Sequence, residues 1–329
     1  MKNIQNEIPR WFSVIIPTLN EEENIERLVR SIQRQDYRPI ETIVVDGGSQ
    51  DNTLEILKTL KKEEDPQFKI RILTEEDSGN PPCPGNARNF GLDKSSGEYI
   101  LFLNGDAVLI EENFLTVLSR ELRNHLMIWH KYKILVDNWL EYNTSLNESS
   151  SQCLAPAFRR EVFENVKFDP SLGAGEDYDF LHRLRKQGIL SDEIKVVDAW
   201  IGLHDVHTLR AYLIQKFWHG RTFWLYFKKH PSVIKSVLMQ SGPIALLFLA
   251  LTMWGLQYFF ASSLMLLTWF IGVLYLFINS PYHGADRLIF ILLMCSLGSL
   301  VRVIGLLRGL YEYMIGTLTP GRKPYWKAA

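Results

Sequence analysis

The 329-residue sequence contains few cysteines and almost no excess of charge of either sign. Its three cysteines (Cys83, Cys153 and Cys295) cannot complete a disulfide framework and lack metal-ligand spacing, so a reducing compartment is expected. With 36 Lys and Arg against 37 Asp and Glu, the formal net charge is -1, which excludes a strongly basic nucleic-acid-binding protein. The 47% of hydrophobic residues excludes a disordered chain or a collagen-like repeat.

One long stretch has no charged side chains at all. From Ser236 to Ala285, fifty consecutive residues include no Lys, Arg, Asp or Glu. A helix needs about 20 apolar residues to cross a bilayer, so the stretch predicts two transmembrane helices, at about 243–260 and 262–279. A buried helical hairpin of a large soluble protein is the alternative. A third apolar segment, at about 288–307, either spans the bilayer or lies at its interface.

Basic side chains flank this stretch on both sides. Three lysines precede the first predicted span, and further basic residues follow the second. Under the positive-inside rule, this distribution predicts a multi-pass protein of the cell membrane whose first part faces the cytoplasm. We therefore expect a soluble domain at 1–205, an amphipathic interfacial connector at 206–235 and a membrane region at 236–329.

Strands and helices are expected to alternate over the first hundred residues. Short apolar runs predict strands at 12–16, 42–45, 70–73 and 99–103, and helical spacing of apolar residues recurs between them. This order predicts an α/β fold, Rossmann-like with a mostly parallel sheet. The sequence lacks the G-x-G-x-x-G and P-loop patterns, which disfavours a dinucleotide-binding protein or an ATPase.

Polar side chains, mostly carboxylates, follow each of the four predicted strands. They lie in the segments 17–21, 46–49, 75–77 and 104–106. Open α/β sheets bind ligands at the carboxyl ends of their strands. A cluster of carboxylates there is costly unless a cation joins it. The pattern therefore predicts a site for Mg²⁺ or Mn²⁺ with the phosphates of a nucleotide.

Four sequence blocks, in this order and spacing, resemble glycosyltransferase family 2: SVIIPTLNEEENI, ETIVVDGGSQDNT, PGNARNFGLDKSSGEYILFLNGDAVL and GAGEDYDFLHRLRKQG. The resemblance covers roughly residues 12–220. It implies a GT-A fold and an inverting enzyme that transfers a sugar from a nucleotide diphosphate sugar. It also implies a divalent metal bound at a D-x-D motif.

The resemblance assigns several positions to the donor and the metal. The residues expected to bind the nucleotide sugar are Pro17, Thr18, Glu21, Asp46, Asp77, Arg88 and Asn104. Asp106 matches the last aspartate of D-x-D and is the expected metal ligand, whereas Asn104 replaces the first aspartate and removes one negative charge. Related enzymes carry a histidine that can serve as a third ligand where this chain has His204. A structural histidine is the alternative there.

Glu176 and Asp177 match the E-D motif of the family. An inverting single displacement needs a carboxylate that takes the proton of an acceptor hydroxyl, and we expect Asp177 to be this base, with Glu176 beside it. If the acceptor is a lipid phosphate, it is already anionic, and Asp177 would orient it instead. Arg88 and the metal would stabilise the departing diphosphate.

The connector mixes aromatic and basic residues, as helices at a membrane interface do. Arg221 or Lys216 is expected to meet an acceptor phosphate, with simple anchoring to anionic lipid as the alternative. The expected function is sugar transfer to a membrane lipid acceptor, either a polyprenyl phosphate or a lipid-linked saccharide. The alternatives are a glycolipid or protein acceptor with the membrane only as an anchor, and an inactive membrane scaffold.

Overall fold

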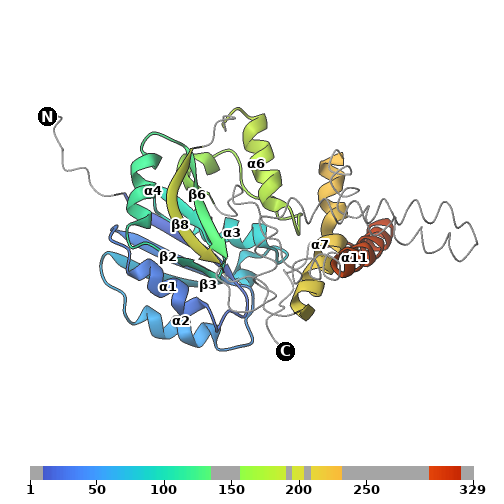
Figure 1. Cartoon of the computed structure of the whole chain (residues 1–329), viewed down its shortest axis with the longest axis horizontal. Helices are drawn as coiled ribbons and strands as arrows, with labels where there is room; N and C mark the ends of the chain where they lie inside the picture. Colours follow the sequence, from blue (N-terminus) through green and yellow to red (C-terminus); the bar gives the residue numbers. More distant parts are fainter. Residues whose placement is uncertain (1–9, 135–155, 190–194, 204–208, 232–295, 320–329) are drawn as a thin grey trace, which may run out of the picture.

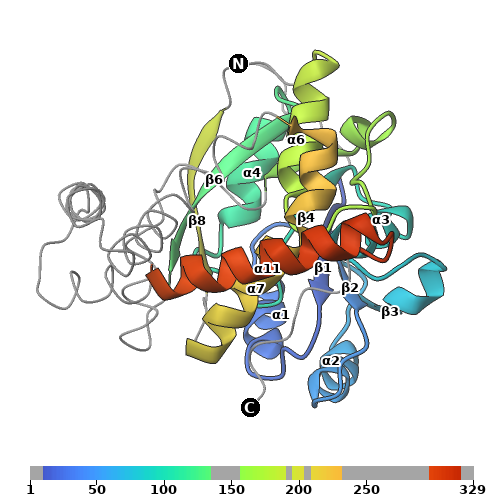
Figure 2. The ribbon, with the colours of Figure 1, turned by 90° about the vertical axis from the view of Figure 1, so that its right-hand side faces the viewer.

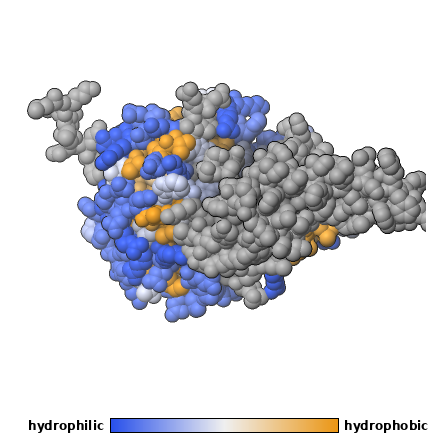
Figure 3. Space-filling view, in the orientation of Figure 1, coloured by the Kyte–Doolittle hydropathy of each residue, from blue (hydrophilic) through white to orange (hydrophobic). Residues whose placement is uncertain are grey.

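The computed structural model describes residues 10–134, 156–189, 195–203, 209–231 and 296–319. Within these residues, one eight-stranded sheet carries helices on both faces (Figure 1). The order of its strands is β3-β2-β1-β4-β7-β6-β8-β5. On the side drawn in Figure 3, hydrophilic residues cover most of the coloured surface, and the apolar residues form only small patches.

The first four strands form the parallel half of the sheet. Their bounds are β1 (Phe12–Thr18), β2 (Ile40–Asp46), β3 (Phe68–Thr74) and β4 (Tyr99–Phe102). β1 pairs with β2 and β4, and β2 pairs with β3, all in parallel. The four predicted strands and the predicted α/β fold are confirmed.

The second half of the sheet is mixed, which the sequence did not predict. Its strands are β5 (Ala107–Leu109), β6 (Met127–Ile134), β7 (Ala157–Arg159) and β8 (Val196–Leu203). β7 runs antiparallel to both β4 and β6, and β5 runs antiparallel to β8. β6 and β8 pair in parallel.

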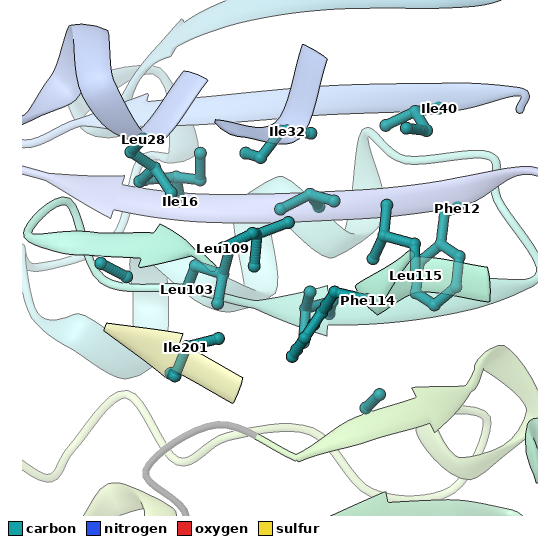
Figure 4. Packing of buried hydrophobic residues seen from close by; sticks show 14 of the residues in the cluster. Phe12, Ile16, Leu28, Ile32, Ile40, Leu103, Leu109, Phe114, Leu115 and Ile201 are labelled. Atoms are coloured by element: carbon teal, nitrogen blue, oxygen red, sulfur yellow. The ribbon is translucent and has the colours of Figure 1, made fainter. Parts of the chain in front are cut away.

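One face of the sheet is covered by α1 (Ile25–Gln33), α2 (Thr53–Lys61) and α4 (Phe114–Leu122). In α1 the buried residues Ile25, Leu28, Val29 and Ile32 follow helical spacing, so one stripe of the helix faces the sheet. Figure 4 shows Leu28 of α1 lying against Ile16 of β1.

The other face is covered by α3 (Pro84–Asp93), α6 (Glu176–Lys186) and two short 3-10 helices, η1 (Glu75–Ser78) and η2 (Arg160–Phe163). An aromatic cluster joins α6 to the sheet: Phe168 and Phe180 stack with their ring centroids 4.5 Å apart, and Phe102 meets Phe168 edge-on at 5.2 Å. Such ring pairs stabilise beyond their buried area, so the start of α6 rests on a rigid base.

The prediction that an α-helical membrane region follows the catalytic domain is wrong. Of the helices in the described residues, none is both long enough and apolar enough to cross a bilayer. The third apolar segment, 288–307, is described only from residue 296, where it belongs to α11 (Ser296–Met314). The two predicted spans, 243–260 and 262–279, and the boundary near residue 205 lie outside the described residues.

α11 packs against α7 (Leu209–Lys229), and both ribbon views show the two helices side by side (Figures 1 and 2). A Cβ atom added at Gly220 of α7 would lie 2.1 Å from the carbonyl oxygen of Arg302, and one at Gly309 of α11 would lie 2.1 Å from that of Arg221. The two backbones therefore touch at glycines. Trp224 Nε1 also donates a hydrogen bond to the carbonyl of Leu306 at 2.7 Å.

A buried ion pair network joins α11 to α7, a contact that the apolar composition of the segment did not predict. Glu312 is only 7% exposed and accepts from Arg221 Nε of α7 and from Arg308 Nε of its own helix, both at 2.7 Å. A buried carboxylate is tolerated only where cations pair with it. The ion pairs therefore stabilise the packing of α11 on α7.

Candidate active site

The polar residues at the ends of the first three strands lie side by side, as predicted. In the register of the sheet, Thr18 pairs with Asp46, and Asp46 pairs with Thr74. Thr18 also lies close to the turn after β4, because a Cβ atom at Gly105 would lie 3.1 Å from Thr18 Oγ1 and 2.7 Å from Glu21 Cγ. Only glycine fits there without displacing these side chains.

Asp46 shapes the loop that follows β2. Its side chain is buried, and its Oδ2 accepts from the backbone N–H groups of Gly48 and Ser49 at 2.9 and 3.0 Å. Its Oδ1 accepts from Ser49 Oγ at 2.5 Å. The carboxylate therefore fixes the edge of the predicted nucleotide pocket.

After β3 the structure buries a carboxylate that the sequence did not single out. Glu75 is 4% exposed, and its Oε1 accepts from the backbone N–H of Cys83 at 2.8 Å and from Asn86 Nδ2 at 3.1 Å. Asp77, the predicted donor-binding residue, is exposed in η1. A buried carboxylate needs hydrogen-bond donors. Asn86, which follows Glu75 closely in the sequence, was the available sign that Glu75 could be buried.

Two buried oxygen atoms at the strand ends have no hydrogen-bond partner among the described residues: Thr18 Oγ1 and Asp106 Oδ1. An unpaired buried carboxylate oxygen is costly, and oxygen ligands are what Mg²⁺ and Mn²⁺ prefer. Asp106 therefore fits the predicted metal. Within the described ranges no three His, Cys, Asp or Glu side chains gather into a metal-binding group. His204 lies outside those ranges.

The E-D pair stands at the start of α6, in contact with α3. Arg88 Nη1 of α3 lies 2.5 Å from Glu176 Oε1, and both side chains are largely buried. The contact joins residues 88 positions apart and brings Arg88 of the third sequence block to the E-D motif. Arg88 was predicted to bind the donor, and here it neutralises Glu176.

Asp177 has the electrostatic character of a general base. Its pKa is raised to about 6, because burial and the adjacent Glu176 carboxylate disfavour its charge, while Arg88 favours it. A base with a pKa near the working pH is the kind that proton transfer requires. Asp179, two residues later, is buried and bonded to Arg183 and His230, so it has different surroundings from Asp177.

The two predicted phosphate-binding residues of the connector are engaged elsewhere. Arg221 pairs with Glu312 between α7 and α11. The Lys216 ammonium lies 4.8 Å from the centre of the Tyr212 ring on its own helix. Their role as ligands of an acceptor phosphate stays a prediction.

Residues 13–175 match the family described as Glycosyl transferase family 2. Those residues form a glycosyltransferase family 2 domain. They contain the predicted donor and metal positions from Pro17 to Asp106, and the match ends directly before Glu176. The chain is therefore an enzyme, a nucleotide-sugar-dependent glycosyltransferase.

Two curated relatives illustrate the similarity. An uncharacterized glycosyltransferase of Haemophilus influenzae is 28% identical over 241 residues, which are 68% of this chain and 91% of that protein. A GalNAc(5)-diNAcBac-PP-undecaprenol beta-1,3-glucosyltransferase of Campylobacter jejuni is 35% identical over 108 residues, about a third of either protein. The likeness to the second relative is thus local.

Among solved structures, a mannosyltransferase of Pyrobaculum calidifontis in complex with GDP-Man and Mn²⁺ superposes with a TM-score of 0.61. It covers 93% of this chain and 88% of that protein at 17% identity. This likeness supports the α/β glycosyltransferase fold.

Proposed function

We propose that the chain transfers a sugar from a nucleotide diphosphate sugar to a lipid-linked acceptor, with inversion at the anomeric carbon. The observation that carries the proposal is the E-D pair, in which Arg88 neutralises Glu176 and the pKa of Asp177 is raised to about 6. The retained carboxylates Asp106, Glu176 and Asp177 argue against an inactive scaffold.

In the proposed reaction, the Asp177 carboxylate takes the proton of an acceptor hydroxyl. The acceptor oxygen bonds to the anomeric carbon as the bond from that carbon to the diphosphate oxygen breaks. Attack from the opposite face inverts the configuration. For a phosphate acceptor, which is already anionic, Asp177 would orient the attacking oxygen instead.

Asp106 would hold the divalent ion, with Asn104 beside it able to offer an amide oxygen. Once bound, Mg²⁺ or Mn²⁺ would neutralise charge on the leaving diphosphate. The unpaired Asp106 Oδ1 supports this assignment. The Mn²⁺ in the Pyrobaculum complex agrees with it.

The lipid-linked acceptor is supported by the Campylobacter relative, whose name specifies an undecaprenol-linked saccharide. Exposed apolar side chains on α11 agree with an amphiphilic acceptor: Ile304 is 50% exposed and Leu307 is 64% exposed. The cytoplasmic location of the reaction stays a prediction.

A transfer assay with the full chain tests the proposal. Purified protein is incubated with a panel of labelled nucleotide sugars, Mg²⁺ or Mn²⁺ and a lipid extract, and label is counted in the chloroform phase. We expect one donor to label lipid, and the Asp106→Ala and Asp177→Ala variants to lose this product. Asp198→Ala, an exposed carboxylate of β8, is the matched control and should retain it. Label found only in the aqueous phase or only on protein would contradict a lipid acceptor.

A further inference from the structure

The second half of α7 lies against the loop before the E-D pair and against the first turn of α6, which carries the pair. Three of its residues and the residue just after it make the contact: Thr222, Tyr226, Lys229 and His230. These positions are spaced by four, three and one along the chain, so they lie on one face of the helix. They reach residues 169, 174, 175 and 179, which flank Glu176 and Asp177 on both sides.

Two of these contacts hold the loop before the E-D pair. Lys229 forms an ion pair with Asp169. The fully buried Thr222 lies with its Oγ1 3.4 Å from the backbone nitrogen of Ala174, at the outer limit of a hydrogen bond.

Tyr226 packs on the residue that starts α6. Gly175 has a left-handed backbone with φ of 89°, and a Cβ atom there would lie 3.0 Å from the Tyr226 ring. Glycine is required at this position both for its backbone and for this close approach. The Tyr226 ring on α7 thus packs directly against the first residue before α6.

His230 makes the contact on the other side of Asp177. Its Nε2 lies 2.8 Å from Asp179 Oδ1, and because a carboxylate can only accept, the ring nitrogen donates. Asp179 Oδ2 accepts from Arg183 Nε at 2.7 Å, and the Asp179 side chain is only 3% exposed. The His230 ring is also flanked by Tyr226 and His182 at 4.6 and 4.9 Å, so it has little room to turn.

We propose that His230 is a positioning residue: by bonding Asp179, it fixes the first turn of α6 and so the place of the Asp177 carboxylate. This inference rests on the proposed role of Asp177 as the base. A small displacement of a reacting group is enough to matter, since a shift of about 1 Å can cost on the order of a hundredfold in rate. Asp179 itself would not touch the substrate.

Steady-state kinetics of four variants of the full chain test the inference. His230→Ala should lower kcat by a factor on the order of ten to a hundred, with KM and Kd for the donor nucleotide unchanged. His230→Gln keeps an N–H donor of similar reach and should recover most of kcat. His125→Ala is the matched control, since the ring of His125 bonds Glu121 one turn earlier. Asp177→Asn reports on the base itself.

The outcomes separate the two claims. If His230→Ala keeps the wild-type kcat while Asp177→Asn is inactive, the positioning role is overturned and the base is retained. If His230→Ala and His230→Gln both lose donor binding together with kcat, His230 is merely structural and the inference is also overturned. If Asp177→Asn keeps the wild-type rate, the proposed base is wrong.

Discussion

Glu176 and Asp177 are neighbouring carboxylates in different electrostatic situations. Arg88 pairs directly with Glu176. For Asp177, burial and the like charge of Glu176 raise the pKa. Two adjacent carboxylates whose surroundings differ in this way commonly have separate roles. Here Glu176 is paired with a cation, and Asp177 is set to exchange a proton near neutral pH.

The pH dependence of transfer follows from the pKa of Asp177. Its value of about 6 lies above the ordinary value of 3.8, so the basic form is lost as the pH falls through 6. With a hydroxyl acceptor, kcat should therefore fall below about pH 6 by tenfold per pH unit. Asp177→Asn should lower kcat by a factor of about 10² to 10⁴ and remove this fall in kcat at acid pH, the acid limb of the profile. A flat wild-type profile between pH 5 and pH 8, measured at saturating donor, would contradict the assignment.

Replacing Arg88 by a neutral residue should shift the acid limb of the kcat profile. Arg88 lowers the pKa of Asp177, so Arg88→Gln should raise that pKa and shift the acid limb of kcat to higher pH. The variant also leaves Glu176 buried without its partner, at a cost of about 3–5 kcal/mol in unfolding free energy. Denaturant unfolding measures the second effect. A limb that stays in place would show that Arg88 does not act on Asp177.

For single residues, the sequence predicts which side chains belong to the candidate site but not which of them contact one another. Asp106, Glu176 and Asp177 follow from strand-end position and motif. The Arg88–Glu176 contact, the burial of Glu75 and the His230–Asp179 contact join residues that tertiary packing alone brings together.

At the scale of elements, one buried carboxylate ties the amino ends of β1, β2 and β4 together. Glu41 Oε1 on β2 accepts from Ser13 Oγ of β1 at 2.6 Å and from the N–H of Gly97, just before β4, at 2.9 Å. Ser96 donates to the same oxygen. Burial alone would raise the pKa of Glu41, but these donors together hold it below its usual range.

The Glu41 network should make stability pH-dependent at the acid end. Because the folded pKa is lowered, this contribution is present above pH 4.5, the ordinary value, and is lost as the pH falls through the folded pKa. Glu41→Gln leaves buried donors facing an amide and should cost about 1–3 kcal/mol at neutral pH. The cost should shrink in acid, measured by denaturant unfolding at both pH values. An equal cost at both would contradict the ionic role.

The packing of α11 on α7 gives a second prediction for elements. A Cβ atom at Gly305 would lie 2.2 Å from the carbonyl oxygen of Phe217, which is backbone and cannot turn away. Gly305→Ala should therefore push the helices apart and destabilise the fold by about 1–3 kcal/mol. Leu307→Ala, on the exposed side of α11, is the control. Equal thermal stability of the two variants would show that the glycine contact is unimportant.

The first four strands were predictable because a short apolar run between two polar turns is typical of a buried strand. α11 was not, because its apolar residues also suit a bilayer and hydropathy does not reveal a partner helix. The overlooked signals were Gly298, Gly305 and Gly309 on α11, all three of which pack closely against α7. The buried Glu312 pointed the same way.

At the scale of the whole molecule, α7 connects two parts that are distant in sequence. One stretch of this helix packs against α11, and its last turn holds the loop and first turn that carry Glu176 and Asp177. In the proposed reaction, the sheet would supply the residues that bind the donor, and α7 would support the E-D pair. The order of elements along the chain does not reveal this support, because α7 follows the family 2 domain that it braces.

The stereochemistry of transfer shows whether the reaction is a single displacement assisted by Asp177. Wild type and Asp177→Asn are given the donor found in the panel, and the anomeric configuration of the product is determined by NMR. We predict a product inverted relative to the donor, formed by the wild type and lost in Asp177→Asn. A product with retained configuration, or an Asp177→Asn variant that works at the wild-type rate, would contradict a single displacement assisted by Asp177.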